Sequence, residues 1–134
     1  MARRIPWKDL FAAATEARAR AYAPYSDFQV GAALYTSDGV IVPGGNVENA
    51  SYGLSICAER NAFSRAVLEG HRRVVAVAIV VDTETPTPPC GMCRQTMAEF
   101  AAPTLEVRCQ NLQGRELRTT LKKLLPHAFT RAFL

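Results

Sequence analysis

The segment Val74–Val81 constrains the fold of this chain more than any other. It reads Val-Val-Ala-Val-Ala-Ile-Val-Val, with neither alternation nor a polar side chain. A strand with one solvated face alternates apolar and polar residues, whereas a strand covered on both faces reads as a continuous apolar run. The segment therefore predicts a central strand, buried by helices that pack on both sides of its sheet.

Local patterns predict further elements before this strand. Apolar residues at helical spacing predict a helix from Trp7 to about Tyr22, which ends just before Pro24. Alternation over Phe28–Leu34 predicts a strand with one buried face. Asp38-Gly39 then predicts a hairpin turn into a short strand over 40–42.

The remaining segments complete an alternation of helices and strands. A helix is predicted over 56–69, a proline-rich loop over 83–89 and a second helix over 92–100. A strand follows over 105–109 and a short helix over 121–125. This order, with a buried central strand, predicts a mixed sheet between layers of helices and therefore the α/β class.

The composition is that of one globular domain spanning residues 1–134. Hydrophobic residues make up 49% of the chain, yet no apolar run approaches the roughly 20 residues that a membrane span requires. No apolar leader follows Arg3 and Arg4, so we expect a cytoplasmic protein. The net charge of +4 comes from scattered residues, and we expect neither a nucleic-acid nor a membrane partner.

Three cysteines are spaced as ligands of one metal ion. Cys90 and Cys93 are three residues apart at a predicted helix start, and Cys57 begins another predicted helix. Glu59 lies two residues after Cys57, about 200° around a helix, so both reach one metal only if the metal lies off the helix's N-terminal end. Three thiolate ligands leave the fourth position of a zinc ion to water, as in catalytic sites. We therefore predict one Zn²⁺ per chain, with Glu59 as the group that moves protons.

Other interpretations of the cysteines differ in how they treat Glu59. Cys90-Gly-Met-Cys93 also resembles a redox pair, and Cys109 could complete a structural four-cysteine zinc site. Neither alternative has a use for Glu59, and Cys109 is better explained as a small buried residue. Arg60 and Arg94 lie next to the ligands in sequence and could offset the thiolate charge, and we favour Arg60.

Several stretches together resemble the small, homotetrameric, all-cysteine type of cytidine deaminase. They cover nearly the whole chain and are Pro24-Tyr25-Ser26 with Phe28 and Val30-Gly31-Ala32-Ala33, Gly45–Tyr52, Cys57–Arg60, Pro89–Gln95, and Leu124-Leu125-Pro126 before Phe129. The zinc motif is shared by many deaminases. The Asn46-x-Glu48 and Leu-Leu-Pro segments are more particular to the enzymes that act on free nucleosides.

The resemblance implies a three-layer α/β/α fold with a central mixed five-stranded sheet. It also implies a homotetramer whose active sites are shared between subunits. Ala50 and Tyr52 would approach the site of an adjacent subunit, and Phe129 would stack on the base in a neighbouring one. Phe133 is an alternative for this C-terminal aromatic, because His127 replaces the small residue that usually follows Leu-Leu-Pro.

The resemblance also implies how the substrate is bound. Asn46 and Glu48 would hydrogen-bond the ribose hydroxyls, and Phe28 would form the pocket wall beside the base. The carbonyl of Ala58 and the N–H of Cys57 would meet the polar edge of the base.

The expected reaction is hydrolytic deamination of free cytidine and deoxycytidine to uridine and deoxyuridine, with release of ammonia, in pyrimidine salvage. Glu59 would take a proton from the attacking water, deliver it to N3 and then protonate the departing amine. The alternatives are a deaminase of a related compound of the blasticidin type, a polynucleotide deaminase, and a non-catalytic zinc or redox module. The sequence does not rank cytidine against deoxycytidine, and the remaining histidine, His71, is expected at the surface.

Overall fold

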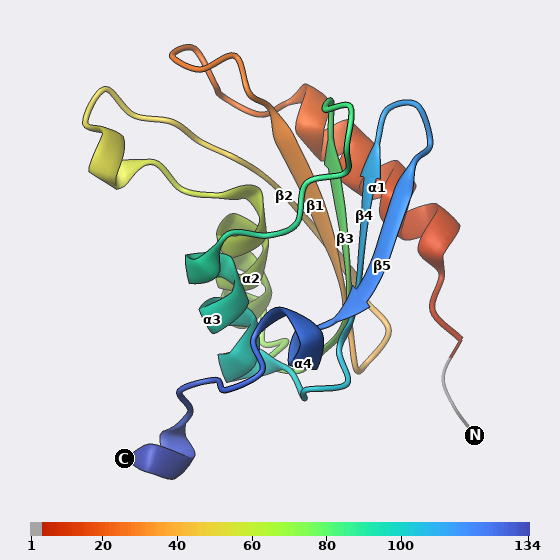
Figure 1. Cartoon of the computed structure of the whole chain (residues 1–134), viewed down its shortest axis with the longest axis vertical. Helices are drawn as coiled ribbons and strands as arrows, with labels where there is room; N and C mark the ends of the chain where they lie inside the picture. Colours follow the sequence, from red (N-terminus) through yellow and green to blue (C-terminus); the bar gives the residue numbers. More distant parts are fainter. Residues whose placement is uncertain (1–3) are drawn as a thin grey trace.

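The structure, a computed structural model that describes residues 4–134, is a five-stranded sheet between two layers of helices (Figure 1). Its helices and strands are, in chain order, α1 (Trp7–Ala19), β1 (Val30–Thr36), β2 (Ile41–Gly45), α2 (Ala58–Leu68), β3 (Val74–Val81), α3 (Gly91–Phe100), β4 (Glu106–Asn111), β5 (Glu116–Thr120) and α4 (Leu121–Leu124). Short 3₁₀ turns lie at Tyr52–Leu54 and Arg131–Phe133. The expected three-layer α/β/α fold is therefore confirmed.

The sheet is mixed, with the strand order β2-β1-β3-β4-β5. Strands β3 and β4 are parallel, and the other neighbouring pairs are antiparallel. Helix α1 covers one face, while α2, α3 and α4 lie on the other (Figure 1). The local patterns predicted four of the strands; β5, with polar Glu116, Arg118 and Thr119, followed only from the family resemblance.

Strand β3 has the predicted bounds and is buried on both faces. Ala76, Ala78 and Val80 belong to the apolar cluster under α1. Val77 and Ile79, which point to the opposite face, belong to the cluster under α2 and α3. The continuous apolar run of β3 thus reflects a helix layer on each side of the sheet.

The prediction of one buried face for the first strand was wrong. Strand β1 begins at Val30, and its residues 31–34 are buried on both faces. The strand lies between β2 and β3, with α1 over one face and α2 over the other. Its small residues Gly31 and Ala33 reflect how closely α1 approaches, because a Cβ on Gly31 would lie 1.8 Å from the carbonyl oxygen of Ala14.

Helix α1 ends at Ala19, three residues before the predicted end at Tyr22. The backbone of Tyr22 instead bonds to the loop after β2: its N–H donates to the Asn46 carbonyl, and its carbonyl accepts from the N–H of Glu48. This pairing takes the backbone groups that would have continued the helix. Tertiary contacts therefore end the helix several residues before Pro24, the residue that was expected to end it.

His71 is more covered than the expectation of a surface residue allowed. Its side chain is 17% exposed, and its Nδ1 lies 2.8 Å from a carboxylate oxygen of Asp38 in the β1–β2 turn. The surface prediction for His71 was therefore wrong, because the turn folds over the end of α2.

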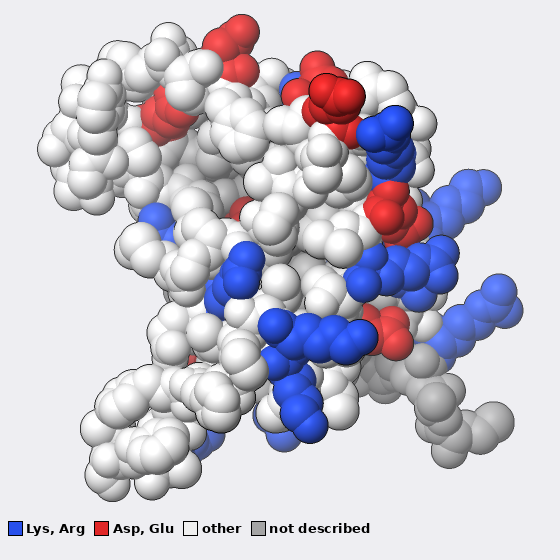
Figure 2. Space-filling model, viewed as in Figure 1, with Lys and Arg blue, Asp and Glu red and all other residues white. Residues whose placement is uncertain are grey.

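The charged residues are unevenly spread over the face seen in Figure 2. Lys and Arg side chains gather toward the β5 and α4 side of this face, with Asp and Glu between them. Among the helices of residues 4–134, none has the length and apolar character needed to cross a membrane.

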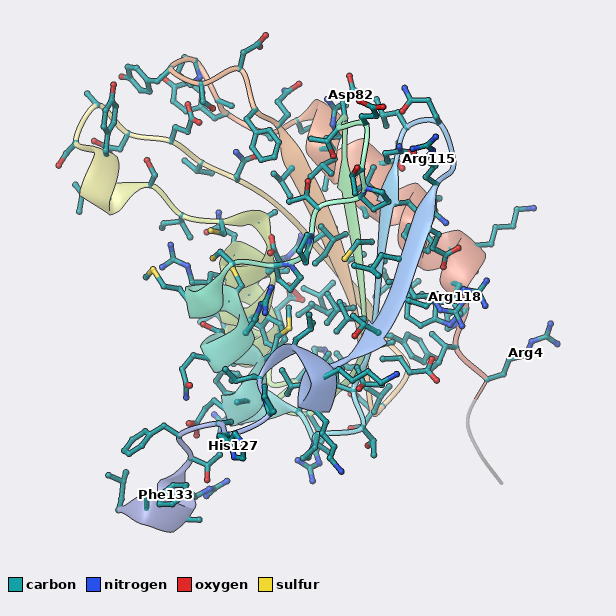
Figure 3. The ribbon with its side chains drawn as sticks, in the orientation of Figure 1. Arg4, Asp82, Arg115, Arg118, His127 and Phe133 are labelled. Atoms are coloured by element: carbon teal, nitrogen blue, oxygen red, sulfur yellow. The ribbon has the colours of Figure 1, made fainter. Side chains whose placement is uncertain are left out.

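The C-terminal segment leaves the body of the molecule. Figure 3 shows Phe133 in this segment, away from the sheet, with His127 nearer to α4. The rings of Phe129 and Phe133 stack with their centroids 5.9 Å apart, and both side chains are exposed.

Candidate active site

The three predicted metal ligands meet at the N-terminal ends of two helices. Cys57 is the N-cap residue of α2, Cys90 is the N-cap residue of α3, and Cys93 lies in the first turn of α3. An N-cap residue is half outside the helix, so its side chain projects beyond the helix end. The N-terminal ends of both helices lie at the sulfur cluster, and both dipoles favour negative charge there.

The sulfur geometry fits a tetrahedral zinc ion. The Cys57 and Cys90 Sγ atoms are 3.7 Å apart, the Cys90 and Cys93 Sγ atoms are 3.5 Å apart, and all three lie within 4.8 Å of one another. Two sulfurs bound to one tetrahedral zinc at about 2.3 Å would lie about 3.8 Å apart. The donor set and its spacing therefore suit zinc, and Cys109, buried in β4, lies outside the cluster.

The environment of Cys57 favours the thiolate form that a metal requires. The Cys93 thiol donates to Cys57 and lowers the pKa of Cys57 to about 5, and the Arg60 guanidinium acts in the same direction. Cys109 has no such partner, and burial raises its pKa to about 12. The hydrogen bond between Cys93 and Cys57 raises the pKa of Cys93 in turn. Cys93 would therefore lose its proton as zinc binds, since only a deprotonated sulfur binds zinc.

Glu59 stands beside the sulfurs with its carboxyl group removed from solvent. It lies in the first turn of α2 and is 5% exposed. Burial raises the pKa of its carboxyl group, and the nearby Cys57 thiolate acts in the same direction. Burying a carboxyl group costs stability, and a buried carboxyl group with a shifted pKa in a cavity is typical of a functional site.

A cavity of about 220 Å³ connects Glu59 and the sulfurs with solvent. Val30, Ile79 and Val81, at the ends of β1 and β3, form an apolar part of its wall. The other described residues that line it are Phe28, Asn46, Glu48, Ser55, Ile56, Cys57, Ala58, Glu59, Thr87, Pro88 and Cys90. An apolar pocket with a few converging polar groups is the usual form of a small-molecule site.

Comparison with known proteins agrees with this geometry. Residues 6–109 match the model of the cytidine and deoxycytidylate deaminase zinc-binding region. A cytidine deaminase from Halalkalibacterium halodurans is 56% identical over 117 residues, which are 87% of this chain and 89% of that protein. One from Mycobacterium tuberculosis is 44% identical over 125 residues, 93% of this chain and 90% of that protein.

Solved structures give the same result. The chain superposes on a crystal structure of cytidine deaminase from Burkholderia pseudomallei with a TM-score of 0.89 and 51% identity, covering 93% of this chain and 100% of that one. The chain belongs to the cytidine and deoxycytidylate deaminase family. Membership in this zinc-binding family and the sulfur cluster together identify zinc as the cofactor.

In this deaminase-family chain, two of the predicted ribose-binding residues line the cavity and already have partners. Asn46 is 8% exposed; its Oδ1 accepts from the N–H of Val30 and its Nδ2 donates to the carbonyl of Phe28, both at 2.8 Å. The Glu48 carboxylate accepts hydrogen bonds from the loop at Tyr25 and Ser26. The hydrogen bond from Ser26 is the main reason why the pKa of Glu48 lies below its ordinary value.

Some of the other predicted substrate-binding residues line this cavity and others do not. Phe28 and Ala58 line it. Ala50, Tyr52 and Phe129 are not among the described residues that line it, and Tyr52 and Phe129 are 76% and 59% exposed. Their predicted roles lie at the site of another subunit and stay predictions.

The two arginines beside the ligands have different partners. Arg60 lies against Cys57, and its Nη2 donates to the carbonyl of Ser55 at 3.2 Å. Arg94 donates from Nε to the Pro89 carbonyl and from Nη1 to that of Leu124. Arg60 is thus the arginine placed to act on a ligand sulfur, while Arg94 joins the α3 end to the C-terminal segment.

Sequence reasoning missed several cavity residues. Ile56, Thr87 and Pro88 line the cavity but belong to no motif that the sequence presents. Ile79 and Val81 were recognised only as buried strand residues. An apolar residue beside a cavity has the same sequence signal as one in the core, so only the fold could separate them.

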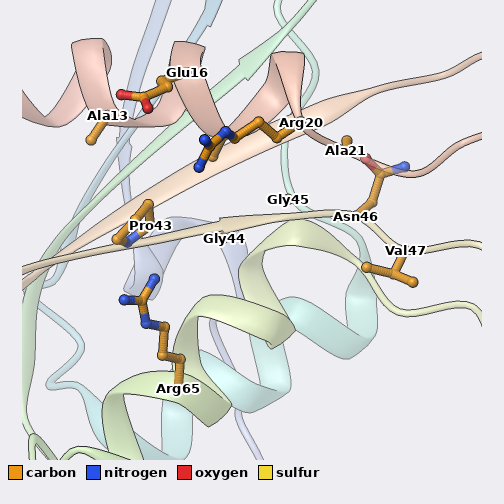
Figure 4. A pocket seen from close by; sticks show the side chains of 11 residues that line it. Ala13, Glu16, Arg20, Ala21, Pro43, Gly44, Gly45, Asn46, Val47 and Arg65 are labelled. Atoms are coloured by element: carbon orange, nitrogen blue, oxygen red, sulfur yellow. The ribbon is translucent and has the colours of Figure 1, made fainter.

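A second cavity, of about 310 Å³, lies behind Asn46 and away from the sulfurs. Arg20 from the end of α1 and Arg65 from α2 reach toward Pro43 on the edge strand β2 (Figure 4). Arg65 is also paired with Glu69 at 2.8 Å. The cavity holds neither a ligand sulfur nor Glu59 and is separate from the candidate active site.

Proposed function

We propose that this protein is a zinc-dependent hydrolase that deaminates free cytidine and deoxycytidine to uridine and deoxyuridine and releases ammonia. The observation that carries the proposal is the buried carboxyl group of Glu59 in the same cavity as Cys57 and Cys90, two of the three cysteines whose sulfurs are spaced for zinc. A structural zinc site needs neither a cavity nor a buried carboxyl group. The relatives described above are named cytidine deaminases, which supports this choice of substrate.

The chain's own residues divide the chemistry between them. Cys57, Cys90 and Cys93 would hold the zinc, which when bound acts as a Lewis acid and makes water a nucleophile near neutral pH. Glu59 would accept one proton of the attacking water and pass it to N3 of the cytosine ring. It would then take the remaining proton from the hydroxyl group added at C4 and deliver it to the departing amine. Water adds at C4, the C4–N4 bond breaks, and the products are uridine and ammonia.

Substrate recognition would use both walls of the cavity. Phe28 and the apolar ends of β1 and β3 suit the faces of a base, while Glu48 and Asn46 suit sugar hydroxyls. The carbonyl of Ala58 and the N–H of Cys57 would contact the polar edge of the base. A ligand without sugar hydroxyls would lose its hydrogen bonds to Glu48 and Asn46, which costs affinity.

The exposed C-terminal aromatic pair supports a shared site in a homotetramer. Phe129 and Phe133 stack on each other but leave most of their surface in solvent. Exposed aromatic surface of this kind is typical of contacts with another subunit. Phe129, Ala50 and Tyr52 would then complete active sites of neighbouring subunits. We place the enzyme in the cytoplasm, in pyrimidine salvage, with a free nucleoside and no nucleic acid as its substrate.

The test is the loss of cytidine absorbance on addition of purified protein whose zinc content has been measured. Wild-type protein with about one zinc per chain should convert cytidine, and Glu59→Ala should keep the zinc but not convert it. Full zinc occupancy without conversion of either nucleoside would refute the proposal. Conversion of a blasticidin-like compound instead would reassign the substrate.

A further inference from the structure

The loop before β1 holds the carboxylate of Glu48 from two sides. The Oε1 atom accepts from the N–H groups of Tyr25 and Ser26, at 3.0 and 3.2 Å. The Oε2 atom is hydrogen-bonded to the Ser26 hydroxyl. Ser26 therefore contacts both oxygens of the carboxylate, one through its backbone and one through its side chain.

These contacts limit what Glu48 can still bind. An ionised carboxylate offers about four lone-pair positions, two on each oxygen. Two positions on Oε1 and one on Oε2 are occupied by the loop. One position, on Oε2, remains for a donor in the cavity, and the Ser26 hydroxyl determines its direction.

The same hydroxyl also bonds to a second residue that lines the cavity, Phe28. Ser26 Oγ accepts from the N–H of Phe28 at 3.0 Å. Asp27, between them, has φ of 59°, a left-handed conformation that turns the chain back on itself. Phe28 and Glu48 both line the cavity, so one hydroxyl sets the positions of two cavity residues.

An alternative is that Ser26 only stabilises the loop. The backbone N–H groups of Tyr25 and Ser26 already hold the loop to Oε1, and the chain there is exposed. The hydroxyl adds the one contact that orients Oε2, the oxygen with a free position. The two roles differ in which ligands they affect.

We infer that Ser26 is a positioning residue for sugar recognition, acting through Glu48 and tying it to Phe28. This inference rests on the proposed nucleoside substrate. It makes the hydroxyl of Ser26 matter only for ligands whose sugar donates a hydrogen bond to Glu48. Cytidine and 2′-deoxycytidine have such a hydroxyl, and 2′,3′-dideoxycytidine does not.

The test compares wild type with Ser26→Ala on three ligands. We expect kcat/KM for cytidine and 2′-deoxycytidine to fall about tenfold, mainly through KM, because a hydrogen bond to a charged group is lost. The inhibition constant of 2′,3′-dideoxycytidine should stay within about twofold. In a protein that already carries Glu48→Gln, adding Ser26→Ala should lower kcat/KM for cytidine by less than about twofold, since the two residues act as one unit.

Matched variants keep the comparison independent of folding. Ser26→Thr and Ser26→Val have side chains of equal size and differ in the hydroxyl, so the threonine variant should recover activity that the valine variant lacks. Ser64→Ala, an exposed serine on α2 outside the cavity, should behave as wild type.

The outcomes separate this inference from the proposed function. An equal loss with all three ligands, or none with any, would overturn the inference while wild-type conversion of cytidine leaves the function standing. Wild-type protein that converts neither nucleoside would overturn both.

Discussion

Replacing Gly44 by alanine should disturb the zinc site without changing any ligand. Gly44 lies on β2 beneath the first turn of α2, and a Cβ there would be 2.6 Å from the Ala58 carbonyl oxygen and 2.6 Å from the Ala62 amide nitrogen. Both atoms belong to the helix backbone and cannot rotate away. To reach an ordinary contact of 3.4 Å, α2 must move about 0.8 Å away from β2.

This displacement has two expected consequences. Overpacking of a well-filled interior lowers the free energy of unfolding by about 1–3 kcal/mol. Cys57 and Glu59 move with the start of α2, whereas Cys90 and Cys93 stay on α3. Because a misplacement of about 1 Å costs up to about a hundredfold in rate, we expect kcat for cytidine to fall between tenfold and a hundredfold.

Urea unfolding, zinc content and kcat measure these effects together. Gly53→Ala is the matched control, since a Cβ at Gly53 meets no atom within 4 Å and should leave the unfolding midpoint unchanged. A Gly44→Ala protein with wild-type stability and wild-type kcat would refute the reasoning. Loss of stability with unchanged kcat would show that α3 follows α2.

Three further predictions concern the site and the β1–β2 turn. Glu59→Gln should retain zinc and the urea midpoint while kcat falls by about a thousandfold, and turnover near the wild-type value would contradict the proton-transfer role. Cys93→Ala should lose zinc as measured by elemental analysis, whereas Cys109→Ala should keep it and lose about 1 kcal/mol of stability through a small cavity; equal zinc loss in both would contradict the three-sulfur site. Hydrogen bonds from Thr36 and His71 hold the pKa of Asp38 below its usual 3.8. The ionised form therefore stabilises the fold above that value, and this contribution is lost as the pH falls through the lowered pKa. Asp38→Asn should thus lower the urea midpoint at about pH 6, and the difference from wild type should shrink as the pH falls below 3.8. A pH-independent difference would argue against the assignment.

Much of the fold was predictable because the burial of an element determines the local pattern of its apolar residues. The apolar run of β3 required cover on both faces, and the structure supplies α1 on one side and α2 with α3 on the other. Strand β5 has no such apolar pattern, because its exposed and half-buried polar residues resemble those of a loop. The one-faced prediction for β1 failed for a related reason, since small residues are buried under a close helix as readily as large ones.

In the candidate active site, the sequence predicted the residue types and their chemistry, whereas the fold determined their positions. Residue type and spacing predicted the zinc ligands and the neighbouring carboxylate, because the preference of zinc for sulfur and the geometry of a helix are local properties of the chain. Only the tertiary structure showed that the N-terminal ends of α2 and α3 lie together at the sulfurs, and that Ser26 holds Glu48. It also placed Arg60, the arginine favoured from the sequence, against Cys57. These contacts join segments far apart in sequence, and their geometry depends on how closely the helices pack on the sheet.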